Sequence, residues 1–479
     1  MKNRFNFSVS ILTFLLASLV IVWLCQSHHI QFSPIKISVE NFLLGLFSLY
    51  ALGVICVGLW DKTNYKTAFS PKGLLIFSLT LMLILSIFHR QVGIIGTGIF
   101  VICSFLYVLL NRKVYAVNAV YLFILLYALM DLLGTIGSEK GFRFPEMTYT
   151  FYLIPLSFSC FQLDKITLFK IIKVLGRVMM LFIAVSVIYW FYNLMRLDVT
   201  FIDWITKKIN VNNISGAQYV SDWCRYWHPS YINLVLLPTL MSVFYVFYKK
   251  NESVQISINE VIILMVGCIT YQFISESRVG FVAIVLLLIV SALYFIYLKS
   301  WHFKAILIAV LVFGGISLFV LQNKVAGFVD DPTRKTDRML AIDYIQTHWW
   351  WGDGYGTEYI VLTQQEAKLK NTLLLVNDAK TYVHNQLLGN MIQFGIAGAI
   401  VLLVFVVGLF WYAFKTRNFL LQMLMLLYFL FMFIEEPLYV QEGITRFMLF
   451  FGLFIHIAES EHHKKEYGLF DWFAKSQSS

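Results

Sequence analysis

Residues able to do chemistry gather in one interval of this otherwise apolar chain, residues 322–385. The interval contains Arg334 and Arg338, spaced four residues apart, and it ends in His384 immediately before the next apolar run. Two guanidinium groups at this spacing share one face of a helix and can bind an anion. A neutral imidazole at the start of a span can accept a proton near physiological pH. The interval therefore predicts substrate binding by arginines beside a histidine base.

Two shorter motifs place similar chemistry at the ends of apolar runs. In residues 275–280 (SESRVG), Arg278 stands between two spans. Its guanidinium can hold an anion from rigid helices, or it can simply end a span by extending to water. In residues 225–231 (RYWHPSY), Arg225 and His228 are candidate substrate-binding residues. Aromatic residues beside a helix start are also ordinary interface anchors, so both interpretations remain open there.

Further polar features lie around the same interval. Residues 352–356 (GDGYG) permit a tight turn but lack the G-x-x-x-x-G-K-[ST] pattern of a phosphate loop. The tryptophans at 349–351 suit a membrane interface, and 357–376 has helix-like spacing that would let it pack over the site. Glu435 and Glu436 end another span, where they either orient a cation or mark the membrane edge.

The composition indicates a membrane protein. Of the 479 residues, 59% are hydrophobic and 13% are charged, and the mean hydropathy is +0.73. A soluble domain carries about 25% charged residues, so this chain has too little polar surface to cover a water-soluble globule. In a soluble protein the net charge of +10 would favour nucleic-acid binding. Here it is typical of basic cytoplasmic loops, and no nucleic-acid partner is expected.

The apolar runs predict the fold. About 20 apolar residues cross a bilayer core. The N-terminal run resembles a signal peptide but lacks a small-residue cleavage site, so we expect a retained span. We therefore expect an all-α, polytopic transmembrane bundle of about 14 helices, with residues 1–479 forming a single integral membrane domain. The predicted spans are 7–25, 42–60, 73–88, 92–110, 114–133, 147–161, 168–194, 230–248, 258–274, 279–298, 303–321, 386–414, 418–434 and 444–458.

The basic residues between spans predict the orientation. Most of them fall on one side of this plan, which is expected to be the cytoplasmic side and to hold both termini. The segment 322–385 then lies outside as a long loop that closes over the candidate active site. Residues 201–209 have amphipathic spacing and are expected to lie along the membrane surface.

Together these motifs resemble the bacterial O-antigen ligase/polymerase superfamily of membrane glycan transferases. The resemblance covers roughly residues 215–410, and the first 200 residues match only as hydrophobic spans. The motifs are short, but their order around a long outer loop is distinctive. The matching pieces are His228-Pro229-Ser230 at a span start, the turn at 275–278, the loop from Arg338 to His384-Asn385 through 352–356, and the glycine-bearing stretch 395–398.

The resemblance implies an enzyme that moves a glycan from undecaprenyl diphosphate to an acceptor at the periplasmic face of the bacterial inner membrane. It implies that Arg278 and Arg338 bind the diphosphate and that His384 serves the acceptor hydroxyl. A departing lipid diphosphate develops negative charge, which pre-placed guanidinium groups can stabilise without a metal ion. A metal-independent glycosyltransferase working among membrane lipids is therefore expected.

No cofactor and no metal site are expected. The six cysteines have no C-x-x-C spacing, and no D-x-D motif or carboxylate cluster stands beside the arginines. Asp330-Asp331 is the nearest exception and leaves a divalent-ion site open at the sequence level.

The acceptor stays open between three choices. Lipid A–core oligosaccharide would make the chain an O-antigen ligase, our leading interpretation. A second lipid-linked glycan would make it an O-antigen polymerase, and a protein acceptor is the third choice. A polysaccharide transporter or flippase is a more distant alternative, since transporters usually carry ionisable residues or broken helices near mid-bilayer. A structural scaffold gives no reason to gather Arg278, Arg338 and His384 on one side.

Overall fold

A computed structural model of the chain describes residues 38–59, 68–88, 90–115, 118–136, 149–200, 220–224, 229–249, 253–297, 332–370, 383–460 and 466–468. These residues divide into two compact units. The first comprises the described parts of Met1–Gly96 and Asp164–Leu286, and the second those of Thr97–Leu163 and Leu287–Ser479.

The first unit is organised around one long helix, α7 (Lys165–Arg196, 32 residues). Asp164 caps its N-terminus by accepting a hydrogen bond from the amide of Thr167, and apolar side chains are buried along most of its length. The other elements of this unit are α2 (Val39–Leu59), α3 (Pro71–Leu85), the start of α4 (Arg90–Asn111), η2 (Asp222–Cys224), α10 (Pro229–Lys249), α11 (Ile258–Ile274) and the first part of α12 (Arg278–Tyr297). Among them, α2, α3, α10 and α11 pack against α7.

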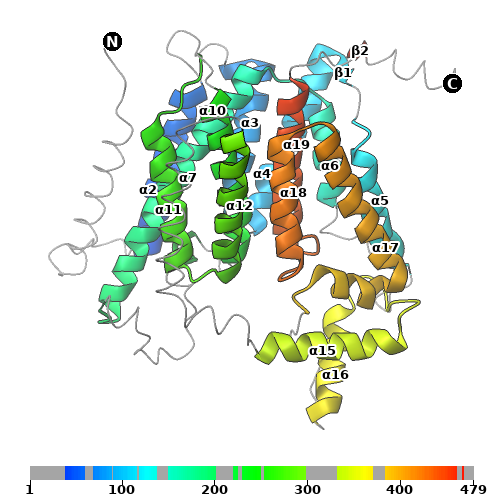
Figure 1. Ribbon diagram of the computed structural model, residues 1–479. Coiled ribbons are helices and arrows are strands. Elements are labelled where there is room, and N and C mark those ends of the chain that lie inside the picture. The colour runs from blue at the N-terminus through cyan, green and yellow to red at the C-terminus, as the bar shows by residue number, and fades with distance from the viewer. Residues whose placement is uncertain are drawn as a thin grey trace. The chain divides into compact units, whose positions relative to one another are not determined.

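The second unit contains the candidate chemistry. Its apolar helices are α5 (Tyr121–Gly134), α6 (Tyr149–Ser159), α17 (Gln386–Lys415), α18 (Phe419–Met432) and α19 (Gln441–Glu459), together with the rest of α4 and α12. Two polar helices, α15 (Pro332–Thr347) and α16 (Glu358–Lys370), lie at one end of α17–α19 (Figure 1). The short strands β1 (Lys113–Tyr115) and β2 (Glu466–Gly468) pair antiparallel at the opposite end of these helices.

The predicted all-α polytopic fold is confirmed. Twelve of the fourteen predicted spans coincide with described helices, and the remaining two, 7–25 and 303–321, lie outside the described residues. Five of the described helices are long and apolar enough to cross a membrane, and five shorter ones are also apolar. The described segments contain fourteen α-helices because α15 and α16 of the loop add to the twelve spans.

One span begins later than predicted. The span predicted at 114–133 is a helix only from Tyr121, because 113–115 pair with β2 instead. Asn118 then turns the chain: its Oδ1 accepts a hydrogen bond from the amide of Val120, and its Nδ2 donates one to Glu459. Side chains such as Val and Tyr favour a strand over a helix when a partner strand is available.

Helix α17 is broken near its start at Gly395, which has φ 60° and ψ −149°. This backbone region is open almost only to glycine. The break also receives the chain that follows α15: the amide of Ile396 donates to the carbonyl of Trp349 (2.8 Å), and the position of a Cβ on Gly395 lies 2.4 Å from the carbonyl oxygen of Trp350. The glycine-bearing stretch singled out in the sequence therefore joins the loop to the membrane helix.

We expect Gly395→Ala to destabilise the protein. The left-handed backbone costs about 1–3 kcal/mol for a non-glycine residue, and the methyl group would overlap the backbone of Trp350. Thermal unfolding in detergent should show a clear fall in midpoint. Gly98→Ala in α4 is the matched control, because nothing lies within 4 Å of its added Cβ. Equal unfolding midpoints for the two variants would contradict the requirement for glycine at position 395.

Candidate active site

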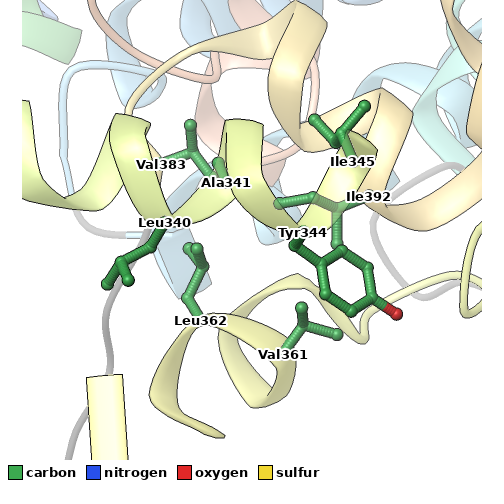
Figure 2. Close-up of a cluster of buried hydrophobic side chains, with 8 residues drawn as sticks. All are labelled: Leu340, Ala341, Tyr344, Ile345, Val361, Leu362, Val383 and Ile392. Atoms are coloured by element: carbon green, nitrogen blue, oxygen red, sulfur yellow. The ribbon is translucent and has the colours of Figure 1, made fainter. Parts of the chain in front are cut away.

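A buried apolar cluster fixes the two loop helices on the start of α17. Side chains from α15, α16 and α17 meet there, and Val383 joins them from the segment just before α17 (Figure 2). The members are Leu340, Ala341, Tyr344, Ile345, Val361, Leu362, Val383 and Ile392. Full burial of a large apolar side chain contributes roughly 1.5–3 kcal/mol. The cluster thereby positions the polar face of α15 and the residue that follows Val383.

That polar face meets the 433–440 turn between α18 and α19. Arg334 donates to the carbonyl of Ile434 (3.0 Å) and pairs with Glu435 (3.2 Å). One turn further along α15, Arg338 donates from Nη2 to the carbonyl of Phe433 (3.1 Å). The prediction that both arginines project from one helical face is confirmed, since both contact the same short turn.

The two arginines differ in their free hydrogen-bonding capacity. Arg334 is paired with the buried carboxylate of Glu435. Arg338 has its Nε buried without a hydrogen-bond partner, and only its Nη2 contacts another described residue. Buried donors are rarely left unsatisfied, so the Nε of Arg338 is a candidate donor to a ligand. Of the two, Arg338 is the better candidate for an anion.

His384 stands beside the same carboxylate. Its Nδ1 lies 3.3 Å from Oε2 of Glu435, whose other oxygen contacts Arg334. Glu435 is buried, whereas the His384 side chain is 31% exposed. A carboxylate at Nδ1 favours the tautomer with the proton on that nitrogen, which leaves Nε2 as the proton acceptor. Of the two alternatives left open for Glu435, the structure favours the one in which it orients a cation, because it contacts both Arg334 and His384.

The backbone at His384 is held in the left-handed region, with φ 53°. This conformation is uncommon for a residue other than glycine and costs about 1–2 kcal/mol. It is maintained from both sides. The amide of Val383 donates to Oε1 of Glu358 (2.9 Å), and the amide of Asn385 lies 3.4 Å from Oε1 of Glu436.

Glu358 and Glu436 are themselves buried. Burial raises the pKa of Glu358 above its ordinary value. Burial also raises the pKa of Glu436, and the adjacent Glu358 carboxyl raises it further, because two like charges cannot both ionise cheaply in a dry site. Both residues lie outside the membrane-spanning helices. Nothing in the sequence singles out Glu358, because its partner is far away along the chain.

The glycine stretch 352–356 forms the predicted tight turn. Gly354 (φ 94°) and Gly356 (φ 76°) both use backbone regions that favour glycine. The amide of Gly354 donates to the carbonyl of Gln393 (2.8 Å), and that of Gly356 donates to the Gln393 side chain (2.8 Å). These amides are therefore used to bind α17. The predicted helix at 357–376 is observed as Glu358–Lys370, and 371–376 lie outside the described residues.

The tryptophans at 349–351 are exposed, by 45%, 57% and 81% in order. Side chains of this kind gain from contact with lipid headgroups, as expected of interface anchors. Their role as anchors stays a prediction.

In the first unit, the turn that carries Arg278 is tightly packed. Gln272 donates to Asn233, and Asn233 donates to Ser277 (3.0 Å), whose hydroxyl also accepts from the amide of Gly280. A Cβ on Gly280 would stand 2.1 Å from both amide side chains. The backbone of Arg278 thus starts α12 from a fixed turn, while its side chain lies outside the described part of the structure.

Two predicted site residues, Arg225 and His228, lie outside the described residues. The carboxylate pair Asp330-Asp331 and the amphipathic stretch 201–209 also lie outside them. Of the predicted site residues, the structure brings Arg334, Arg338 and His384 together at the 433–440 turn. Arg278 belongs to the other unit.

Comparison with known proteins supports the resemblance. Residues 261–403 match the protein-family model described as O-antigen ligase. The match includes α12, α15, α16 and more than half of α17, and it contains Arg278, Arg334, Arg338 and His384. No curated protein matches the chain. The apolar helices indicate a multi-pass membrane protein, and residues 261–403 of its chain are similar to the O-antigen ligase family.

Proposed function

We propose that the protein is an O-antigen ligase of the bacterial inner membrane. It transfers a glycan from undecaprenyl diphosphate to lipid A–core oligosaccharide at the periplasmic face. The observation that carries the proposal is that Glu435 pairs with Nδ1 of His384 on the same turn that Arg338 contacts through Nη2, while Nε of Arg338 has no partner among the described residues. A base and an anion-binding group on one short turn suit glycan transfer from a lipid diphosphate.

In the proposed reaction, the acceptor hydroxyl attacks the anomeric carbon of the glycan. His384 accepts the hydroxyl proton at Nε2, and Glu435 stabilises the imidazolium that forms. The new bond joins the acceptor oxygen to the anomeric carbon, while the bond from that carbon to the diphosphate oxygen breaks. The lipid diphosphate leaves with the bonding electrons, and Arg338 stabilises its charge. Arg278 is a second proposed phosphate ligand, on the strength of its place at a rigid helix start.

The arrangement of the second unit supports a periplasmic site. Lys113, in a predicted cytoplasmic loop, lies in β1 at one end of the unit, and α15 and α16 lie at the other (Figure 1). The long loop would then face the periplasm and close over the site. A cysteine introduced at the exposed Ile342 should react with an impermeant thiol reagent in intact cells. Reaction only after lysis would place the loop in the cytoplasm.

The test of the function is transfer by the purified protein in lipid bilayers. One undecaprenyl-diphosphate-linked glycan is offered separately with lipid A–core, with a second lipid-linked glycan and with a protein acceptor. The proposal expects product with lipid A–core. Product only with the second lipid-linked glycan would make the protein a polymerase, and donor movement across the bilayer without product would make it a transporter.

We expect transfer to be independent of divalent metal ions. The arginines at the site supply the positive charge that a metal would otherwise provide. Transfer rates should therefore persist in excess chelator. Activity that disappears with chelator and returns with Mg²⁺ or Mn²⁺ would contradict this expectation and make Asp330 and Asp331 the candidate metal ligands.

A further inference from the structure

Two buried glutamates from different elements hold the chain on either side of His384. Glu358, at the start of α16, accepts a hydrogen bond from the amide of Val383 (2.9 Å). Glu436, in the 433–440 turn, lies 3.4 Å from the amide of Asn385. His384 is the residue between these two amides, and its backbone is left-handed. Each glutamate bonds to a backbone amide, whereas the imidazole itself bonds to Glu435.

The two carboxyl groups also face one another. Gly389 in the first turn of α17 leaves the space for this approach: the position of its missing Cβ is 3.0 Å from Oε2 of Glu358 and 3.3 Å from Oε1 of Glu436. Glu358 is 0% exposed and Glu436 5% exposed, and Oε2 of Glu358 is buried without a hydrogen-bond partner among the described residues. Two adjacent buried carboxyl groups are stable when one proton lies between them.

We propose that Glu358 and Glu436, here called the glutamate pair, are positioning residues for His384. By sharing one proton, the pair holds both flanking amides and thereby fixes the conformation that presents the imidazole to the acceptor hydroxyl. This role rests on the proposed function of His384 as the base. The pair touches no substrate in this scheme and acts only through the histidine.

The proposal has a consequence for pH. The pKa of each carboxyl is raised by burial, so the shared proton persists above the ordinary carboxyl value. A raised carboxyl pKa stabilises the folded arrangement at low pH, and this stabilisation is lost as pH rises through the raised value. Both carboxylates then carry charge, repel one another and loosen the turn. The charged and titratable groups facing the pair are His384, Glu435 with its partner Arg334, and the phenol of Tyr127 in α5.

The first experiment measures the backbone directly. Hydrogen–deuterium exchange of the full-length protein in lipid nanodiscs reports on the Val383 and Asn385 amides. Glu358→Ala and Glu436→Ala should each accelerate exchange in this segment. Asp343→Asn, a change of an exposed carboxylate on α15, is the matched control and should leave the exchange unchanged. Unaltered exchange in both alanine variants overturns the proposal, whatever their activity.

The second experiment measures transfer against pH. Alanine variants should lose roughly 10- to 100-fold in kcat with little change in KM for the lipid-linked donor, since a displacement of about 1 Å has an effect of that size. Glu358→Gln and Glu436→Gln keep an acceptor for the backbone amide and a donor for the partner carboxyl, so each should restore transfer above its alanine counterpart. The transfer rate of the parent protein should fall as pH rises through the raised carboxyl pKa. Because an amide does not titrate, this fall should be absent in the glutamine variants.

These outcomes separate the two proposals. If the alanine variants exchange faster but His384→Ala transfers glycan at the full rate, the glutamate pair still holds the backbone. His384 is then not the general base. A parent protein without an alkaline fall, or glutamine variants that keep the parental fall, would overturn the shared proton. The shared proton would also be ruled out if the glutamine variants transferred glycan no faster than the alanine variants.

Discussion

His384→Ala should lower the rate of glycan transfer by roughly 10²–10⁴-fold, the usual contribution of a general base. The lipid-linked donor should still bind, because the proposed diphosphate contacts come from arginines. The structure gives the reason for the expected split: Nδ1 of His384 is engaged by Glu435, and the other ring nitrogen has no described hydrogen-bond partner. Transfer and donor binding are to be measured on the same preparation.

The chain offers a matched control for this variant. His348 stands in the same loop, stacked on Tyr344 at 4.2 Å between ring centroids, and its Nδ1 lies beside the carbonyl of Tyr344. His348→Ala should therefore leave transfer unchanged. Parental rates in His384→Ala would remove the base from the mechanism. A loss of donor binding in that variant would instead make His384 a ligand-binding residue.

Arg338→Ala should weaken donor binding by roughly 10- to 100-fold, because hydrogen bonds to charged groups contribute about 1.5–3 kcal/mol and 1.4 kcal/mol is a factor of ten. Among the described residues its buried Nε has no partner, and its Nη2 donates to the carbonyl of Phe433. Arg338→Lys should restore little, because an ammonium group lacks the planar fork that binds phosphate through two nitrogens. Arg278→Lys is expected to lose most of the transfer activity for the same reason, with normal insertion into the membrane.

Two neighbours on α15 make the arginine experiment specific. Lys335 is exposed and forms no ion pair with another described residue, so Lys335→Ala removes a positive charge and should bind donor normally. Arg334→Ala leaves Glu435 buried without its cation, which destabilises the turn itself. It should lower thermal stability as well as transfer. Equal donor affinity in Arg338→Ala and Lys335→Ala would rule out Arg338 as the diphosphate ligand.

The sequence by itself determined the membrane class, the twelve spans now seen as helices and the helical spacing of Arg334 and Arg338. These features depend on local composition and periodicity, which a reader of the sequence can count. It also located the segment around His384, because a polar interval is conspicuous between apolar runs.

Only the tertiary structure decided what those residues do to one another. Arg334 and Arg338 are equivalent in the sequence pattern, yet Arg334 is paired with buried Glu435 and Arg338 has a buried Nε without a partner among the described residues. The partnership of Glu358 with Glu436 arises because α16 and the 433–440 turn converge on Gly389, a meeting of segments distant in the chain. The burial and proximity of two carboxyl groups set their charge state, and both depend on that convergence. Local sequence periodicity does not predict which distant segments converge.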